Sequence, residues 1–324
     1  MSEVRFARAI GAALADGMAA DESVILLGED VAAAGGPFGV TKGLLDRFGE
    51  LRVRDTPISE AAIVGAAVGA ALSGLRPVVE IMFMDFMTLA MDALVNQAAK
   101  AHFMFGGQRS VPLVVRTPHG GGVNAGPQHS QCLEAWFAHV PGLKVVCPAT
   151  PADAYGLMRS ALADPNPVIV VENKALYGLK GDLPAPPPEV AIGKGRIARP
   201  GRDLTIVAYG AAVHIALDAA TRLVSDGIEA EIIDLRSIQP WDEALVLESL
   251  SRTHRLVIAH EAVEVFGVGA EIAARMADVG FDDLDAPIVR VGAPFMPVPF
   301  ARGLEAAYRP DGARLVAAAR RVLA

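Results

Sequence analysis

Residues 55–83 read DTPISEAAIVGAAVGAALSGLRPVVEIMF. A polar turn, DTPISE, leads into small and apolar residues at 61–73, whose length and composition predict a helix. The run 78–83 that follows has the apolar character of a buried strand. A turn, a helix and a buried strand in this order are the repeating unit of a parallel α/β sheet.

The same alternation continues on both sides of this stretch. It predicts buried strands at residues 24–27, 113–116, 144–147 and 168–171, and helices at 86–103 and 152–163. Asp85 and Thr150 stand at or near the starts of these two helices, where short polar side chains cap free amides. The first part of the chain is therefore expected to be an α/β domain.

Residues 180–200 are rich in proline and glycine and have no sustained apolar period, which is typical of a linker. Beyond them, strands are expected at 204–208, 230–233, 256–259 and 288–291, with helices such as 215–223 and 270–276 between them. A chain of 324 residues also exceeds what a single core usually holds. We expect one domain at 1–180, a linker at 181–200 and a second, smaller α/β domain at 201–324.

The composition limits the compartment and the class of partner. The chain is 52% hydrophobic and 20% charged, with a formal net charge of -8. Such acidity disfavours nucleic acids and anionic membranes as partners. Two cysteines allow no disulfide framework, and no apolar run is long enough to span a bilayer or to act as a signal peptide. A cytoplasmic protein with no membrane segment is expected.

Glu60 is the first candidate for chemistry, because it lies in the first turn of the helix expected at 61–73. The helix dipole favours a carboxylate there. The alternative is a glutamate that only begins the helix, which is the more frequent case on position alone.

A glycine-rich loop, TPHGGGVNAGPQHSQ at residues 117–131, follows the strand expected at 113–116. Ligands of parallel sheets bind at the carboxyl ends of their strands. Glycines allow close backbone approach to a ligand, and His129 supplies a group for proton transfer. The alternative is an ordinary flexible connection with a surface histidine, although structureless loops of this length are more often functional.

Met82 and Phe86 stand where the strand expected at 78–83 leads into a helix. By themselves such residues are more often plain core. Gly267-Val-Gly lacks the third glycine of a dinucleotide fingerprint, and Walker, HExxH and GxSxG motifs do not occur. Nucleotide-dependent, zinc-protease and α/β-hydrolase functions therefore lose support.

Five motifs in order resemble one enzyme family: LGED (27–30), DTPISE (55–60), EIMFMDF (80–86), QHSQ (128–131) and AHVPGLKVV (138–146). They resemble the E1 β subunits of thiamine-diphosphate-dependent 2-oxoacid dehydrogenase complexes, the family of pyruvate, acetoin and branched-chain enzymes. The resemblance covers essentially the whole chain. It implies a transketolase-like pyrimidine-binding domain with a parallel sheet, followed by a transketolase-type C-terminal α/β domain.

The resemblance also implies roles for single residues. Glu60 would bind N1′ of the cofactor's aminopyrimidine, and a buried carboxyl is a suitable proton relay for forming a carbanion near neutral pH. Phe86 would pack on the pyrimidine, with Met82 as a nearby wall. His129 would lie at the channel mouth and assist acyl transfer to lipoyl-lysine. Glu29 would be a further cofactor-binding residue. Glu29 and Asp92 also match positions that line an acidic water tunnel in relatives, although both could instead be ordinary polar residues at the ends of their elements.

The diphosphate-binding signature of thiamine enzymes, Gly-Asp-Gly followed by a distant asparagine, does not occur in this sequence. The resemblance therefore places the diphosphate and its Mg²⁺ on a separate α chain, in an α2β2 heterotetramer that acts with a lipoyl E2 and an E3 component. A basic domain of E2 would suit the acidity of this chain. The family also suggests a potassium site, mostly of main-chain carbonyls, at Leu113, Ala161, Leu162, Asp164 and Asn166. Residues 164–167 could equally be only a turn.

The expected function is that of an E1 β subunit that acts on pyruvate or acetoin. A branched-chain 2-oxoacid dehydrogenase is an alternative, because much of the substrate pocket belongs to the α chain. A split transketolase is disfavoured, because residues 117–131 offer no strongly cationic group for a sugar phosphate. A non-catalytic scaffold subunit is a further alternative, disfavoured by the presence of Glu60, Phe86 and His129.

Overall fold

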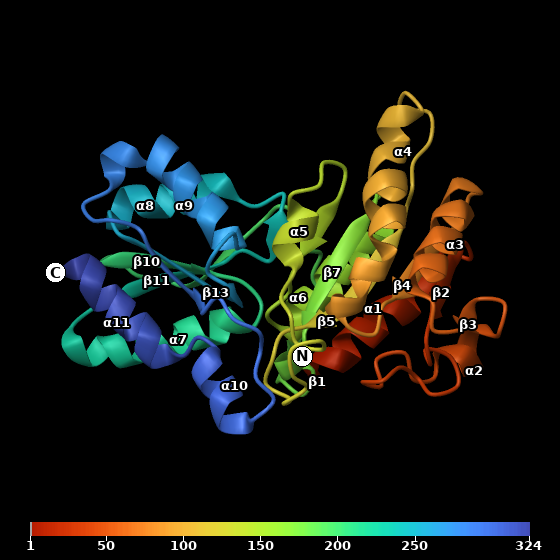
Figure 1. The fold of residues 1–324 in the computed structure, drawn as a ribbon, viewed down its shortest axis with the longest axis horizontal. Coiled ribbons are helices and arrows are strands. Elements are labelled where there is room, and N and C mark those ends of the chain that lie inside the picture. The colour runs from red at the N-terminus through yellow and green to blue at the C-terminus, as the bar shows by residue number, and fades with distance from the viewer. Residues whose placement is uncertain (1) are drawn as a thin grey trace. The chain divides into compact units, whose positions relative to one another are not determined.

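The computed structural model describes residues 2–324; Met1, the first residue of the expected first domain, lies outside them. The described chain forms two compact units, one of residues 2–119 and 136–192, the other of 120–135 and 193–324. Each unit contains its own sheet and helices (Figure 1). The expected α/β class is confirmed, with a mostly parallel sheet in each unit. The limits 1–180, 181–200 and 201–324 stay our proposal for the domains.

The sheet of the first unit has the strand order β6-β7-β5-β4-β2-β3, and all neighbouring strands are parallel. Its strands β5 and β7 are buried along their whole length and β4 is buried after its first residue, as expected where helices cover both faces. The elements of this unit are β1 (Ser2–Arg5), α1 (Phe6–Ala20), β2 (Val24–Gly28), α2 (Leu44–Phe48), β3 (Val53–Asp55), α3 (Glu60–Leu72), β4 (Arg76–Glu80), η1 (Met84–Ala90), η2 (Asp92–Ala98), α4 (Ala99–Met104), β5 (Val114–His119), β6 (Lys144–Val146), α6 (Pro151–Ala163), β7 (Val168–Asn173), η3 (Lys174–Leu176) and β8 (Lys180–Leu183). The short helix α5 (Glu134–Ala138) spans the boundary between the units.

The sheet of the second unit has the order β14-β13-β10-β11-β9, with β9 antiparallel at one edge. Helices α8 and α9 lie on one face of this sheet, and α7 and α11 lie on the other (Figure 1). The elements are β9 (Arg196–Arg199), β10 (Leu204–Ala208), α7 (Ala211–Leu223), η4 (Val224–Asp226), β11 (Ala230–Asp234), β12 (Ser237–Gln239), α8 (Glu243–Thr253), β13 (Leu256–Val263), α9 (Val268–Val279), η5 (Phe281–Asp283), β14 (Val289–Ala293), α10 (Arg302–Tyr308) and α11 (Gly312–Leu323).

The single helix expected at 86–103 is wrong. The chain forms a 3-10 helix, η1, then a π-helix, η2, and only then the α-helix α4. Met84, Met87 and Ala90 are all buried. Their spacing of three residues places them on one face of a 3-10 helix, whereas an α-helix would turn them apart. Asp85 lies in the first turn of η1, and Thr150 caps α6 by accepting from the amide of Asp153 at 3.1 Å.

The expected structureless linker contains two strands. β8 pairs antiparallel with β1, and β9 pairs antiparallel with β11 at the edge of the second sheet. Neither strand has a continuously buried face. An apolar period therefore could not reveal them, because their pairing rests on backbone hydrogen bonds at an edge rather than on core packing.

No helix among the described residues is long and apolar enough to cross a membrane.

Candidate active site

Four of the expected site residues follow three neighbouring strands of the first sheet. In the strand register, Gly28 of β2 lies opposite both Asp55 of β3 and Glu80 of β4. Glu29 comes directly after β2, Glu60 follows β3, and the segment with Met82 and Phe86 follows β4. Since the strands are parallel, these segments leave the sheet at the same edge, which is where α/β proteins bind their ligands.

Glu60 is the first residue of α3, directly after Ser59. Its side chain is almost fully buried, with 4% exposed. Among residues 2–324, no side chain or amide donates a hydrogen bond to its carboxylate. Buried carboxylates normally have partners inside the protein, so this one is suited to a partner that the chain itself does not supply.

Glu29 is a second buried carboxyl at this edge, with 8% exposed. Burial, and after it the charges of Glu60 and Asp30, raise the pKa of the Glu29 carboxyl. The Glu60 carboxylate is thus close enough for its charge to act on Glu29. A pair of this kind holds a proton more readily than two separate carboxylates do.

Asp55, at the end of β3, fixes the loop that follows Glu29. Its carboxylate accepts from the amides of Ala32 at 2.7 Å and Ala33 at 3.3 Å. The amide of Thr56 donates to the carbonyl of Gly28 at 2.9 Å. The polar turn at 55–60 therefore does two things: it carries Glu60 and it holds the neighbouring loop.

Aromatic rings lie on the chain that leaves β4. The rings of Phe83 and Phe86 meet edge to face, with centroids 5.8 Å apart, and Phe38 meets Phe83 in the same way at 6.1 Å. Met82 and Phe86 are half-buried, and η1, which carries Phe86, packs against α3. Phe38 was not among the expected site residues, because no motif includes it.

A cluster of buried charges lies across β4, β5 and β7. The Arg116 guanidinium donates to Glu80 through Nη1 and to Glu172 through Nε at 2.9 Å and Nη2 at 2.5 Å. The Tyr177 hydroxyl donates to Glu172 at 2.7 Å. Burial raises the pKa of Glu80 although Arg116 acts to lower it. Here two carboxyls face one guanidinium, and all their partners are internal.

The glycine-rich loop differs from its expected place. Residues 120–135 belong to the second unit rather than to the sheet from which they emerge. Glu261 of β13 accepts from the amide of Gly121 at 2.7 Å, and buried Glu305 of α10 accepts from the amide of Asn124 at 3.1 Å. Arg309 donates to Glu261 at 3.0 Å. These anchors come from far along the chain, so sequence periodicity could not identify them.

His129 lies in this loop and is half-buried, and its amide donates to the carbonyl of Gly126 at 3.4 Å. Glu134, the first residue of α5, is buried and accepts from the Tyr209 hydroxyl at 2.8 Å. The Tyr209 ring stacks near that of buried His260, whose pKa is lowered by burial. Tyr209 and His260 were not among the expected site residues.

The five residues of the expected cation site lie near the starts of β5 and β7, at the edge of the sheet opposite Glu60. Arg76 donates to the carbonyl of Leu162 at 2.8 and 3.0 Å and to that of Asp164 at 3.0 Å. The Leu113 carbonyl accepts from Val168 at 2.9 Å, and that of Ala161 accepts from Asp164 at 3.3 Å. The carboxylate of Asp164 pairs with Lys144, and the buried Oδ1 of Asn166 has no hydrogen-bond partner among the described residues.

The edge of the sheet where the segments after β2, β3 and β4 emerge fits the aminopyrimidine that the resemblance implied. An aminopyrimidine needs an acceptor for a ring N–H and apolar surfaces for its faces. The buried, unpartnered carboxylate of Glu60 supplies the acceptor, and the half-buried side chains of Met82 and Phe86 supply apolar surface beside α3.

Comparison with known protein families supports this description over most of the chain. Residues 2–180 match the family model "Transketolase, pyrimidine binding domain", and residues 193–315 match "Transketolase, C-terminal domain". The four site residues at the ends of β2, β3 and β4, which are Glu29, Glu60, Met82 and Phe86, all fall within the first match.

Among curated proteins, the β subunit of acetoin:2,6-dichlorophenolindophenol oxidoreductase from Cupriavidus necator is 47% identical over 97% of this chain and 96% of its own length. The protein of the same name from Bacillus subtilis is 47% identical over 95% of this chain and 94% of its own. The pyruvate dehydrogenase E1 component subunit beta of Rhizobium meliloti is 46% identical over 99% of this chain and 70% of its own.

Among solved structures, a split-gene transketolase described as an inactive beta4 tetramer superposes with a TM-score of 0.82 over 99% of this chain and 98% of its own. At 23% identity, this likeness shows the fold alone.

Proposed function

The chain belongs to the family of E1 β subunits of thiamine-dependent dehydrogenases, as its motifs predicted, and on that basis we propose that it supplies half of a thiamine diphosphate site. The observation that carries the proposal is the buried carboxylate of Glu60, which lacks a hydrogen-bond donor among the described residues. It lies on α3, against which the aromatic-bearing segment η1 packs.

Thiamine diphosphate, when bound, supplies an acidic carbon whose carbanion attacks the carbonyl of a substrate. In our proposal Glu60 binds N1′ of the aminopyrimidine and shares a proton there. Glu29, whose pKa is raised, lies close enough to stabilise that proton electrostatically. Phe86 and Met82 hold the ring in place and keep water from it. The role of Asp92 in an acidic water tunnel with Glu29 stays a prediction.

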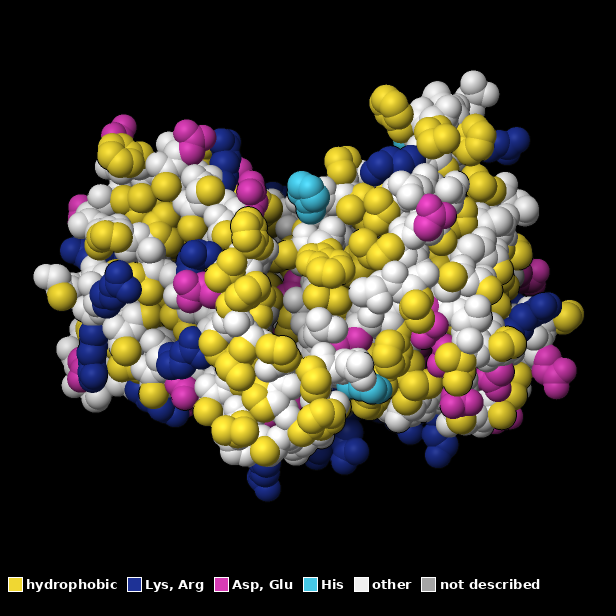
Figure 2. Space-filling view, viewed as in Figure 1, with side chains coloured by type: hydrophobic (Ala, Val, Ile, Leu, Met, Phe, Trp, Pro, Cys, Tyr) yellow, Lys and Arg dark blue, Asp and Glu magenta, His cyan; other side chains and the backbone are white. Residues whose placement is uncertain are grey.

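We propose that a separate α chain completes the site with Mg²⁺ and the diphosphate, in an α2β2 heterotetramer. The absence of a Gly-Asp-Gly motif from the sequence supports this division. An apolar surface also supports assembly: Phe103, Met104 and Phe105 at the end of α4 are 88%, 70% and 50% exposed. Figure 2 shows hydrophobic side chains gathered at that end of α4. Exposed apolar groups of this kind are typical of surfaces that a partner covers.

We propose acetoin or pyruvate as the substrate, since the relatives quoted above bear those names. The acyl group would pass to a lipoyl E2 in a complex that includes E3, with His129 assisting the transfer. A branched-chain 2-oxoacid dehydrogenase, a split transketolase and a non-catalytic scaffold subunit are the alternatives for the test. The cytoplasmic location also stays a prediction.

We propose that a potassium ion binds at the expected cation site, whose residues are Leu113, Ala161, Leu162, Asp164 and Asn166. The buried Oδ1 of Asn166, which has no hydrogen-bond partner among the described residues, supports this proposal. Arg76 opposes such an ion, because it already brings positive charge to two of the carbonyls. Thermal unfolding in K⁺ and in choline at equal ionic strength tests the site. A higher Tm in K⁺ that Asn166→Ala removes is expected; equal Tm values contradict it.

The function is tested by dye reduction with this chain co-purified with its α partner, thiamine diphosphate and Mg²⁺. The panel is acetoin, pyruvate and 2-oxoisovalerate. We expect cofactor-dependent turnover of acetoin or pyruvate. Turnover of 2-oxoisovalerate alone would assign the branched-chain reaction. An assembled, cofactor-bound complex that turns over none of them would contradict the proposed function.

A further inference from the structure

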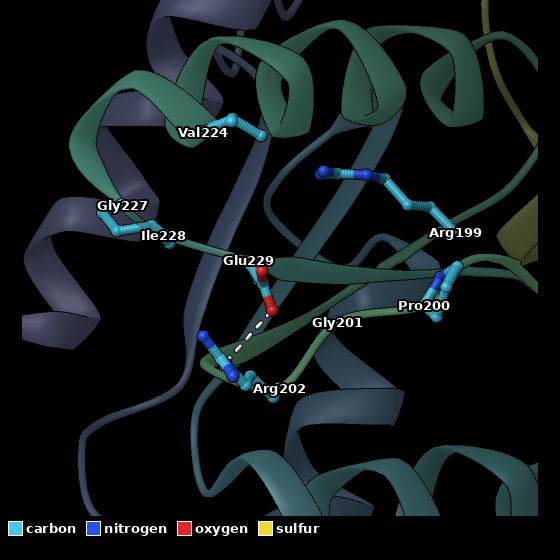
Figure 3. Close-up of a pocket in the computed structure, with 8 residues that line it drawn as sticks. All are labelled: Arg199, Pro200, Gly201, Arg202, Val224, Gly227, Ile228 and Glu229. Atoms are coloured by element: carbon cyan, nitrogen blue, oxygen red, sulfur yellow. Dashed lines mark ion pairs between the residues drawn. The ribbon is translucent and has the colours of Figure 1, made fainter.

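The second unit contains a cavity of about 570 Å³ away from its glycine-rich loop (Figure 3). Its walls come from the chain between β9 and β10 and from the chain between α7 and β11. The lining residues are Arg199, Pro200, Gly201, Arg202, Val224, Gly227, Ile228 and Glu229. The volume lies within the range of small-molecule sites, roughly 300–1,000 Å³.

The two arginines of this cavity differ in their partners. Arg202 forms an ion pair with Glu229 at 3.1 Å, drawn as a dashed line in Figure 3. Arg199 reaches into the cavity from the end of β9, and Figure 3 shows its guanidinium extending toward the helix end that carries Val224. Its Nη1 is buried and has no hydrogen-bond partner among residues 2–324. A buried donor nitrogen without an acceptor is unfavourable unless a ligand supplies one.

Neighbouring backbone groups do not offer competing donors. The amides of Gly227 and Ile228 donate within the helix end, to Val224 at 3.0 Å and to Leu223 at 3.1 Å. The amide of Glu229 donates to the Asp203 carboxylate at 2.6 Å. The negative end of a helix dipole also suits an arginine, but none of its carbonyls accepts from Nη1 of Arg199. The charge of Arg199 is therefore the one left for a ligand.

We propose that this cavity binds a small organic anion, a carboxylate or a phosphate monoester, through Arg199. Guanidinium groups pair with both kinds of anion in a two-pronged geometry. Arg202 pairs with Glu229 at 3.1 Å and lies 4.0 Å from the Asp203 carboxylate, so among the two arginines of the cavity only Arg199 has no carboxylate partner among residues 2–324. The apolar part of the ligand lies against Pro200, Val224 and Ile228. The site goes beyond the proposed function, and none of its residues belongs to the thiamine site.

Calorimetric titration of the purified full chain tests the site with phenyl phosphate, benzoate and inorganic phosphate at constant ionic strength. We expect saturable binding of at least one of the two organic anions, more tightly than inorganic phosphate. Arg199→Met should weaken it at least tenfold, and Arg199→Lys should weaken it less, because the charge is kept. The matched control is Arg222→Met, which removes an arginine paired with Asp218 on the surface of α7; it should change the affinity less than twofold.

Three results would overturn the proposal. The first is the lack of saturable binding of either organic anion to the parent chain. The second is an equal loss of affinity in Arg199→Met and Arg222→Met, which would show general attraction to positive charge. The third is that inorganic phosphate binds as tightly as the organic anions, which would show that the apolar residues of the cavity do not contribute to binding. Thermal unfolding of each variant verifies that it is folded. If Arg199→Met does not fold, the affinity of Arg199→Lys still tests the site.

Discussion

The first unit buries two groups of carboxyls at the same edge of one sheet, and they differ in their partners. Glu80 and Glu172 share the Arg116 guanidinium, and Tyr177 adds a further donor. Glu60 and Glu29 are near enough for the charge of Glu60 to act on Glu29, and neither carboxylate has a cationic partner or a hydrogen-bond donor among residues 2–324. We will call these the closed group and the open group.

The difference teaches how burial alone can mislead. Both groups are removed from water, so burial does not distinguish a structural carboxyl from a functional one. The closed group has its hydrogen-bonding needs met inside the chain, which is what packing and stability require. The carboxylates of the open group have no hydrogen-bond donor or cation among the described residues, and such positions are where ligands bind.

Replacement of Glu60 by glutamine should have the largest effect on activity. The amide keeps the size of the side chain but cannot take part in the same proton exchange. Dye reduction by the assembled complex should fall by at least about 10²-fold, the usual contribution of a general acid or base, while Tm changes little. The matched control is Glu50→Gln, at an exposed glutamate of the same unit. Near-parental turnover in Glu60→Gln would refute the role of the open group.

Replacement of Arg116 by methionine should have the largest effect on stability. It leaves Glu80 and Glu172 buried without their cation, and breaking a buried pair in this way costs about 3–5 kcal/mol. Urea denaturation of the full chain measures the loss. Arg275→Met is the control, since Arg275 pairs with Glu243 and Asp278 on the surface and exposed pairs contribute little. A similar small loss in both variants would show that the closed group does not stabilise the fold.

The pH dependence of stability should distinguish Glu80 from an ordinary glutamate. Its folded pKa is raised above the unfolded value of about 4.3, so the folded chain holds this proton more firmly than the unfolded chain does. That contribution is complete below the unfolded pKa and is lost as the pH rises through the folded pKa. Relative to Glu80→Gln, the parent should lose free energy of unfolding above pH about 4.5, by at most about 1.4 kcal/mol per pH unit.

Urea denaturation of both proteins between pH 4.5 and 8 tests this expectation. Parallel profiles for the parent and Glu80→Gln would show that Glu80 has an ordinary pKa in the folded state.

Replacement of Asp55 by asparagine should give the smallest effect. Ala32 donates to Oδ1 of Asp55 and Ala33 to Oδ2, so the single side-chain oxygen of asparagine can accept from only one of the two amides, and that bond loses the charge that strengthens it. We expect a loss of about 1 kcal/mol of stability and a few-fold rise in the thiamine diphosphate concentration needed for half-maximal activity. Asp46→Asn, on the short helix α2, is the control. An unchanged cofactor requirement would show that Asp55 does not position the open group.

Much of the fold could be predicted because its signals are local. The strands at 24–27, 204–208 and 230–233 lie within the observed β2, β10 and β11, since continuous apolar runs mark strands that helices cover on both faces. The change from a 3-10 helix to a π-helix between Met84 and Ala98 was missed, because the composition of the segment does not distinguish these helices from an α-helix; both η1 and η2 pack against α3.

The sequence by itself determined the α/β class, the family and the identity of Glu60, Phe86 and Met82 as candidates, because each rests on a contiguous pattern of residues. Only the tertiary structure decided which buried carboxyls are partnered. Arg116 is 36 residues from Glu80 and 56 from Glu172, and Glu261 is 140 residues from the glycine it holds. Such contacts form where strand order brings separate segments together, and strand order cannot be obtained from the period of any one segment.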